Sequence, residues 1–184
     1  MLFRSARQSL RAEVRGRGTL VVLPDPVACF AGASYEQRTE IELASEASCV
    51  VLDGITSGRP AYGERWAMER VALRTRIRRD GRRLLDDALV LDARDEPIAR
   101  RMTGNDAWLT VTASGPRALP LRDALLDPAP TRGAAVVAAP SPLGPDGAIV
   151  RVAAPSPDAA LADVRRRLRN LPDIDAVDTF GARR

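Results

Sequence analysis

The segment from residue 53 to residue 66, DGITSGRPAYGERW, combines charged side chains with glycines that can shape a loop. Gly58 and Gly63 directly precede Arg59 and Glu64, and glycine suits positions where φ is positive or two backbones approach closely. One interpretation is a shaped loop that presents Arg59 and Glu64 for chemistry. The other is a tight connection held by an ion pair of Arg59 with Glu64 or with Asp53. The spacing alone favours this structural interpretation.

Two sets of acidic residues and one set of basic residues could also carry chemistry. Asp86 and Asp87, or the acidic residues within 92–96, could pair carboxylates for acid–base work or for a hard cation. Neighbours on a strand point to opposite faces, so we expect Asp86 and Asp87 to lie at a solvated strand edge and not in one site. The arginines within 165–169 could bind phosphate, but a solvated helix face explains them as well.

The composition closes several routes to catalysis. The chain contains no histidine and no lysine, so all 28 basic residues are arginine. This excludes a Ser-His-Asp triad, an HExxH zinc site, Schiff-base chemistry and a Walker lysine. Cys29 and Cys49 lack CxxC spacing; they could be soft metal ligands, and we expect them to be buried as small hydrophobic residues.

Most of the chain shows the two-residue hydrophobic period of β-strands. The clearest strand is 35–43, in which Tyr35, Gln37, Thr39, Ile41 and Leu43 share one face. Asp80-Gly81 joins two alternating runs at 71–78 and 84–91, which predicts a hairpin with a type I′ turn. Further strands are predicted at 19–23, 48–52 and 107–112, and a second hairpin joins 134–139 to 148–153 through loop 140–147.

One helix is predicted at 157–170. Ser156 is a suitable N-cap, Pro157 takes the first helical position, and Leu161, Val164 and Leu168 form an apolar stripe. Residues 119–126 admit a second, short helix. The sequence therefore predicts a mainly β fold with stacked β-sheets, hairpins and one C-terminal α-helix.

The order of motifs over residues 3–112 resembles the urease accessory protein family UreD, also called UreH. The family pattern has a strand that ends in a proline pair, then PF-x-G-A-x-Y, then a GR-x-x-x-GE element and a strand–DGR–strand hairpin. The counterparts here are Pro26, Phe30, Gly32, Ala33 and Tyr35, then Asp53, Thr56, Gly58, Arg59, Gly63 and Glu64, and finally Asp80, Gly81 and Arg82.

The resemblance implies a cytoplasmic scaffold or chaperone and not an enzyme. UreD-like proteins act with UreF and the GTPase UreG in nickel incorporation into apo-urease, and nickel is expected to pass through an internal tunnel. No tightly bound cofactor is implied, only nickel in transit, and neither nucleic acid nor membrane is an expected partner. Because histidine is absent, nickel ligands must be carboxylates, carbonyls, water or thiols, and we predict Asp53 and Glu64 for this role.

The resemblance also predicts a single UreD-like domain over residues 1–184 that is N-terminally incomplete, since the family's GG-rich segment before Phe3-Arg4-Ser5 has no counterpart. A truncated, non-functional copy is one alternative. A basic β-rich nucleic-acid-binding module is another, although the net charge is only +4 and the aromatic content 4%. A small hydrolase that uses two carboxylates is the third.

Overall fold

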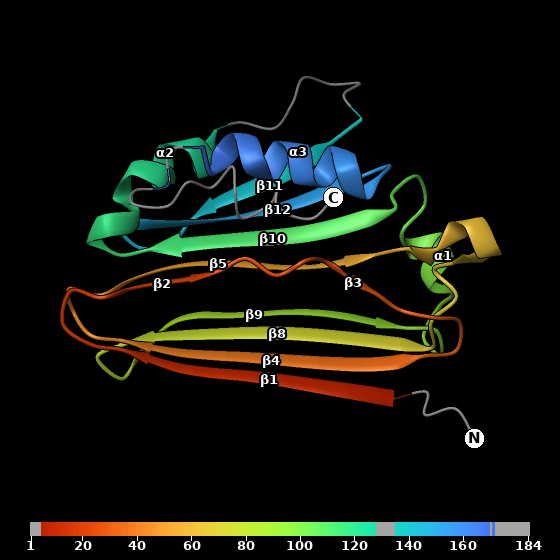
Figure 1. Ribbon diagram of the computed structural model, residues 1–184, viewed down its shortest axis with the longest axis horizontal. Coiled ribbons are helices and arrows are strands. Elements are labelled where there is room, and N and C mark those ends of the chain that lie inside the picture. Colours follow the sequence, from red (N-terminus) through yellow and green to blue (C-terminus); the bar gives the residue numbers. More distant parts are fainter. Residues whose placement is uncertain (1–4, 128–134, 170, 172–184) are drawn as a thin grey trace.

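Two stacked β-sheets and a layer of helices make up the protein (Figure 1). The computed structural model describes residues 5–127, 135–169 and 171. A four-stranded sheet has the order β1-β4-β8-β9, and a six-stranded sheet has the order β11-β12-β10-β5-β2, with β3 also paired to β5. Helices α2 and α3 cover the outer face of the six-stranded sheet (Figure 1). The predicted mainly β fold with stacked sheets is confirmed.

The element bounds are as follows. The strands are β1 (Ser5–Val14), β2 (Thr19–Val22), β3 (Val27–Ala28), β4 (Ser34–Leu43), β5 (Ser48–Thr56), β6 (Gly58–Arg59), β7 (Glu64–Arg65), β8 (Arg70–Arg79), β9 (Arg82–Asp92), β10 (Ala107–Ser114), β11 (Val137–Pro142) and β12 (Gly147–Ala154). The helices are α1 (Ile98–Arg101), α2 (Leu119–Leu126) and α3 (Pro157–Arg167), with 3-10 turns η1 (Pro60–Tyr62) and η2 (Pro116–Ala118).

The first half of the chain winds back and forth between the two sheets. Strands β1, β4 and β8 are neighbours in the four-stranded sheet and run parallel, while β2 and β3 run parallel to β5 in the other sheet. The β1–β4 and β4–β8 ladders carry no register shift. Side chains of one face therefore line up in straight rows across the sheet.

The predicted Asp-Gly hairpin is present. Asp80 has φ 47° and Gly81 has φ 74°, the two positive values that a type I′ turn requires, and they join β8 to β9. The helix prediction is also confirmed, since the Ser156 side chain accepts a hydrogen bond from the Ala159 backbone N–H at the start of α3. Both α2 and α3 pack on β12 and β10.

Three apolar clusters form the core. The largest lies between the six-stranded sheet and the helices and includes Leu52, Leu109 and Leu168. The space between the two sheets holds two separate clusters, one around Trp66 and Val71 and one made of Ile41, Leu43, Ala47, Cys49, Val51 and Ile77. The interior between the sheets is therefore not one continuous apolar core.

Some predicted bounds differ from the structure. The second hairpin turns at residues 143–146, and not through 140–147, because Pro140 and Pro142 belong to β11. This is an edge strand, where a proline without an N–H is tolerated. Helix α3 ends at Arg167, before Leu168, instead of reaching residue 170. The predicted positions 134 and 170, and the family motif at residues 3 and 4, lie outside the described residues.

Candidate functional site: a polar strip between the two sheets

Two rows of polar side chains face each other between the apolar clusters of the sandwich. In the four-stranded sheet the strand register aligns Thr39, Thr75 and Asp87. In the six-stranded sheet the register aligns Asp53, Thr110 and Arg151. We call these six residues, together with Gln37, the polar strip.

Asp53 lies at the centre of the polar strip. Its side chain is buried, with a relative exposure of 8%. Gln37 Nε2 donates a hydrogen bond to Asp53 Oδ1 at 2.5 Å, and the Thr75 hydroxyl donates one to Oδ2. Burial raises the pKa of Asp53; the two hydrogen bonds oppose this rise, and the nearby Asp87 carboxylate adds to it. The two donors come from β4 and β8, so Asp53 links the two sheets.

Polar contacts extend the strip toward both edges of the sandwich. Tyr35 Oη lies 2.9 Å from Gln37 Oε1 and 3.0 Å from Gln8 Oε1, which reaches the edge strand β1. At the other side Arg151 Nη2 donates to Asp87, so β12 is tied to β9. The polar residues thus extend from near β1 to β12, with Asp53 between them.

The polar strip offers oxygen ligands without forming a closed chelate. Carboxylate, amide and hydroxyl oxygens suit a divalent cation. Among the described residues, no group of three or more Asp, Glu, Cys or His is placed to hold a metal ion. A cation at Asp53 would therefore meet fewer than three such groups, complemented by the neutral oxygens of Gln37 and Thr75.

Glu64 occupies a different place from Asp53. It lies on β7 opposite Arg59 on β6, and the Arg59 guanidinium donates to it through Nε at 2.9 Å and through Nη2 at 2.7 Å. The Glu64 carboxylate also accepts a bond from the Ala31 backbone N–H. The hydrogen bonds from Arg59 lower the pKa of Glu64. Of the two ion pairs considered from the sequence, the structure therefore contains the Arg59–Glu64 pair.

Gly58 and Gly63 both have positive φ, one of the two conditions for which the sequence indicated glycine. Gly58 has φ 94°, and a Cβ there would lie 2.6 Å from the Cys29 carbonyl oxygen and 2.9 Å from that of Glu64. Gly63 has φ 74°, and the space that a Cβ would occupy there is open. The two glycines therefore serve different needs: Gly58 allows a close backbone approach, whereas Gly63 only allows a left-handed turn.

The adjacent carboxylates Asp86 and Asp87 point to opposite faces, as predicted. Asp86 lies on the outer face, where Arg74 contacts it at 2.8 Å and Arg76 at 3.4 Å. The Arg74 hydrogen bond lowers the pKa of Asp86 to about 2. Asp87 points inward to Arg151, so it belongs to the polar strip and not to a solvated edge.

The other sequence candidates have structural roles. Cys29 and Cys49 are buried free cysteines, as expected, and burial raises the pKa of Cys49 to about 12. In the arginine run, Arg166 and Arg167 both pair with Asp163, and Arg167 is fully buried against backbone carbonyls that include those of Ala124 and Leu125. Arg167 thus holds the end of α2 against α3 and is not part of a solvated face.

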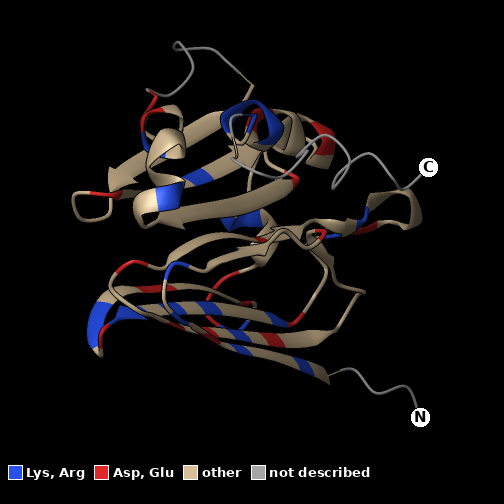
Figure 2. Cartoon of the chain, turned by 60° about the vertical axis from the view of Figure 1, so that its left-hand side comes forward, with Lys and Arg blue, Asp and Glu red and all other residues tan. Residues whose placement is uncertain are grey.

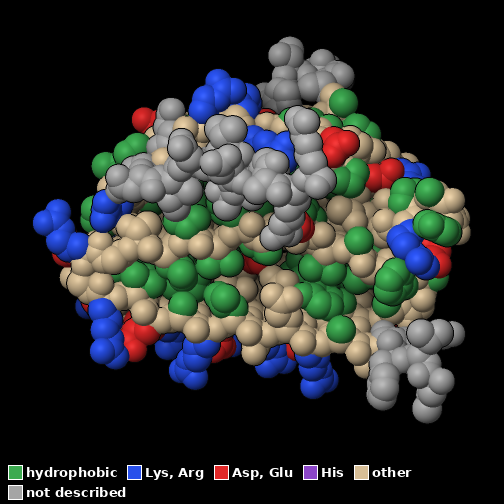
Figure 3. Space-filling model, in the orientation of Figure 1, with side chains coloured by type: hydrophobic (Ala, Val, Ile, Leu, Met, Phe, Trp, Pro, Cys, Tyr) green, Lys and Arg blue, Asp and Glu red, His purple; other side chains and the backbone are tan. Residues whose placement is uncertain are grey.

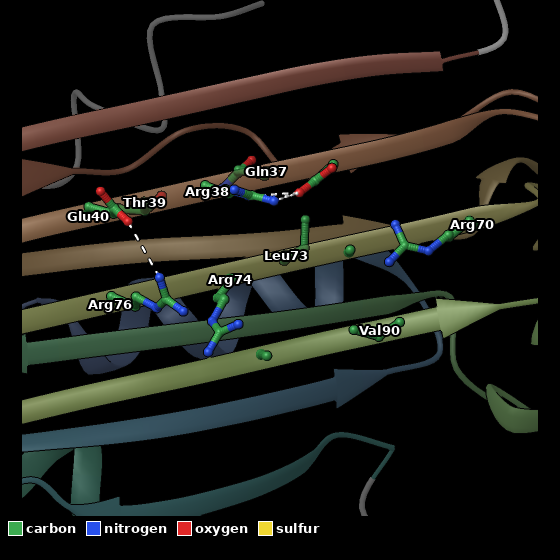
Figure 4. A pocket seen from close by; sticks show the side chains of 12 residues that line it. Gln37, Arg38, Thr39, Glu40, Arg70, Leu73, Arg74, Arg76 and Val90 are labelled. Carbon is green, nitrogen blue, oxygen red and sulfur yellow. Dashed lines mark hydrogen bonds and ion pairs between the residues drawn. The ribbon is translucent and has the colours of Figure 1, made fainter.

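The outer face of the four-stranded sheet carries a hollow of about 370 Å³ (Figure 4). Its floor includes Ala72 and Ala88, and arginines from β4 and β8 surround it. Basic and acidic residues are interspersed over this sheet (Figure 2), and Arg76 contacts Glu40 at 3.6 Å. The arginines that line the hollow are in ion pairs with acidic neighbours: Arg38 with Glu36, Arg70 with Asp92, Arg74 with Asp86, and Arg76 with Asp86 and Glu40. Because these arginines already occupy the acidic side chains around the hollow, this face offers a cation fewer available oxygen ligands than the polar strip does.

Asp53 was predicted from the sequence as a site residue, whereas its partners Gln37 and Thr75 and the Asp87–Arg151 pair were not. A signal was present, because Gln37 and Thr39 occupy the otherwise apolar face of the predicted strand 35–43. Polar residues at inward positions of a strand require partners in the interior. Asp53, the partner of Gln37 on β5, and Thr75, the register neighbour of Thr39 on β8, are distant in sequence and become visible only when the strands are paired and stacked.

Comparison with known proteins identifies the family. The model of the UreD urease accessory protein family matches residues 2–174. A "Urease accessory protein UreD" of Sorangium cellulosum (strain So ce56) is 47% identical over 177 residues, which cover 95% of this chain and 57% of that protein. A protein of the same name from Anaeromyxobacter sp. (strain Fw109-5) is 40% identical over 181 residues, or 95% of this chain and 60% of the relative.

A more distant relative, "Urease accessory protein D" of Arabidopsis thaliana, is 37% identical over 112 residues, which cover 60% of this chain. The chain spans less than two thirds of the length of these relatives. In the part of the chain that the structure describes, no helix is both long and apolar enough to cross a membrane. The family match over nearly the whole chain agrees with the motif order from Pro26 to Arg82, and this chain belongs to the UreD urease accessory protein family.

Proposed function

We propose that this chain is a cytoplasmic scaffold for the incorporation of nickel into apo-urease, and that it acts together with UreF and the GTPase UreG. Family membership supports the urease-related role. The observation that carries the nickel-handling part is the polar strip, in which a buried carboxylate and neutral oxygens separate two apolar clusters.

In this proposal nickel ions use the polar strip as a path and Asp53 as a transient ligand. A passing divalent cation favours the charged form of Asp53, which burial alone disfavours. The strip holds no group of three or more such ligands among the described residues, so an ion at Asp53 would be held weakly. Weak binding suits a path, because a tight closed site would retain the ion. Thr75 and Gln37 can turn their hydrogen-bonding groups as the ion replaces them at the carboxylate.

Glu64 remains a second proposed ligand, with a different requirement. Its carboxylate is held in two hydrogen bonds by Arg59, so nickel would have to replace this ion pair before binding. We therefore expect a weaker dependence of nickel incorporation on Glu64 than on Asp53.

Complementation of a strain that lacks its own UreD tests the proposed function. The chain should restore urease activity, Asp53→Asn should reduce it about tenfold, and Glu64→Gln should reduce it less. Circular dichroism and denaturation of each variant separate loss of function from loss of fold. Full activation by the Asp53→Asn, Glu64→Gln double variant would remove both residues from the path, and no activation by the parent chain would contradict the scaffold role.

A further inference from the structure

Asp87 brings a second carboxylate into the polar strip. Its register partner on β8 is Thr75, whose hydroxyl donates to the Asp53 carboxylate. The Asp87 carboxylate also acts on Asp53 electrostatically, because it contributes to the raised pKa of that group. The two carboxylates are therefore neighbours in the interior, and each comes from a different sheet.

The Arg151 guanidinium is bound to only one of these two carboxylates. Its Nη2 atom donates a hydrogen bond to Asp87 Oδ1. Arg151 also shares a row of the six-stranded sheet with Asp53, and Thr110 lies between them in the register. The side-chain hydrogen bonds that Asp53 accepts come from Gln37 and Thr75. The strip thus keeps one carboxylate in an ion pair and leaves the other with neutral donors.

The Asp87–Arg151 pair lies where the polar strip reaches the surface. The Arg151 side chain is 32% exposed and the Asp87 side chain 19%, whereas Asp53 is only 8% exposed. An arginine can keep its aliphatic part on the protein while its charged end is in water. The pair can therefore open by moving the guanidinium into water, which costs less than moving it within the apolar interior.

We propose that Arg151 limits the affinity of the polar strip for nickel by holding the Asp87 carboxylate away from an ion at Asp53. This inference rests on the proposed function and deepens it, since it names what keeps the path from retaining its ion. The affinity of an oxygen site for a divalent cation rises with the number of charged ligands. Asp53 and Asp87 together would bind the ion more tightly than Asp53 does with neutral oxygens. Arg151 is thus a positioning residue.

The charge of Arg151 acts in the same direction as its hydrogen bond. The Asp87–Arg151 pair has no net charge, so an approaching Ni²⁺ meets only the negative charge of Asp53. Without Arg151 the ion would meet two negative charges, and attraction between charges is stronger inside a protein than in water. Both effects predict tighter nickel binding when Arg151 is replaced by a neutral residue.

A matched ion pair lies on the other face of the same strand. Asp86 precedes Asp87 in β9, and Arg74 donates to it through Nε at 2.8 Å and through Nη2 at 2.9 Å. This pair belongs to the outer face of the four-stranded sheet, which lies at the lower side of the molecule in Figure 1; basic and acidic side chains project from that side in Figure 3. Arg74→Gln therefore removes the closest partner of a carboxylate that lies outside the polar strip.

Titration of the full chain with Ni²⁺, in competition with a coloured chelator, tests the proposal. Arg151→Gln should bind nickel about tenfold more tightly than the parent chain, and its nickel should leave more slowly when excess chelator is added. Arg74→Gln is the control and should stay within about twofold of the parent. The double variant Arg151→Gln, Asp87→Asn replaces the ion pair by a neutral pair, so its affinity should return to that of the parent. A residue with only a structural role would not tighten binding when it is replaced.

The results that overturn the proposal differ from those that overturn the proposed function. If Arg151→Gln binds nickel no more tightly than the parent while Asp53→Asn binds it more weakly, the role of Arg151 is wrong and the nickel path stands. The role is also wrong if the double variant keeps the gain or if Arg74→Gln shows the same gain. If Asp53→Asn binds nickel as tightly as the parent, the path fails and the role of Arg151 fails with it.

Thermal unfolding with and without Ni²⁺ covers the case in which Arg151→Gln loses its fold. An ion that binds only the folded state stabilises that state, and more so when it binds tightly. Nickel should therefore raise the melting temperature of Arg151→Gln more than that of the parent, and should restore the fold if the variant is unfolded without it. A variant that stays unfolded in saturating nickel, or a smaller rise than in the parent, would contradict the proposal.

Discussion

The Thr75 hydroxyl donates a hydrogen bond to the buried Asp53 carboxylate across the interior of the sandwich. Thr75 belongs to β8 of the four-stranded sheet and Asp53 to β5 of the six-stranded sheet. This contact joins the two sheets at a place where the apolar clusters are interrupted. Burying a polar bridge at such a position costs free energy, because its groups lose their contacts with water. This bridge and the Gly58–Glu64 motif lead to four predictions about stability.

Asp53→Asn should change how stability depends on pH. The pKa of Asp53 is raised by burial above its unfolded value of 3.8, so the folded state binds its proton more tightly than the unfolded state does. The contribution of Asp53 to stability is therefore highest in acid and falls as pH rises from 3.8 through the raised pKa. Asparagine does not titrate, so the variant should gain stability relative to the parent over this window, as measured by urea denaturation at several pH values. An unchanged difference from acid to neutral pH would contradict the buried environment.

Thr75→Val should lower the free energy of unfolding by about 1–3 kcal/mol, because Asp53 Oδ2 loses its donor in the interior. Thr39→Val is the matched control. Thr39 is buried in the same row, and the side-chain hydrogen bonds that Asp53 accepts come from Gln37 and Thr75 and not from Thr39. Its substitution should change stability by less than about 0.5 kcal/mol. Equal effects of the two substitutions, measured by chemical denaturation, would show that the bond to Asp53 contributes nothing.

Gly58→Val should destabilise the protein more than Gly63→Val. Both positions have positive φ, where a β-branched residue costs about 1–3 kcal/mol in backbone strain. At Gly58 the added Cβ would also collide with the Cys29 and Glu64 carbonyl oxygens, which belong to the backbone and cannot simply rotate away. Differential scanning calorimetry of the two variants measures the order, and a reversed order would contradict the geometry of the motif.

Glu64→Gln should lower stability at neutral pH but not in strong acid. The hydrogen bonds from Arg59 lower the pKa of Glu64 below 4.5, so its contribution is present above that value and is lost as pH falls through the lowered pKa. Unfolding free energies of the variant and the parent should therefore converge in acid. A difference that stays constant over the whole pH range would mean that the ion pair is not the cause.

Local patterns in the sequence predicted the strands well. The alternation in 35–43, the Asp80-Gly81 turn and the capped helix at Ser156 each depend on neighbours within one or two turns or a single hairpin. The spacing of Gly58 and Gly63 likewise indicated positive φ or a close backbone approach, and the Arg59–Glu64 ion pair was one of the two pairs it allowed.

The site was harder to predict, because its residues meet only through the stacking of two sheets. Asp53 and Thr75 are 22 residues apart, and Asp87 and Arg151 are 64 apart. No local period relates such pairs; the parallel ladders β1–β4–β8 and the antiparallel ladders around β10 bring them into line. The role of Arg167 was missed for the same reason, since its carbonyl partners lie on the preceding helix.

The rate of nickel transfer into urease tests most directly whether the polar strip is a path for nickel. In an assembly of this chain with UreF, UreG and apo-urease, radioactive nickel bound to urease is counted over time for the parent, Asp53→Asn and Asp86→Asn. Asp86 is the matched control, because its carboxylate lies on the outer face of the four-stranded sheet, whereas the Asp53 carboxylate lies in the strip. We predict that Asp53→Asn slows transfer about tenfold while Asp86→Asn leaves it unchanged. Equal rates for the parent and Asp53→Asn, with both proteins folded and assembled, would contradict a nickel path through the polar strip.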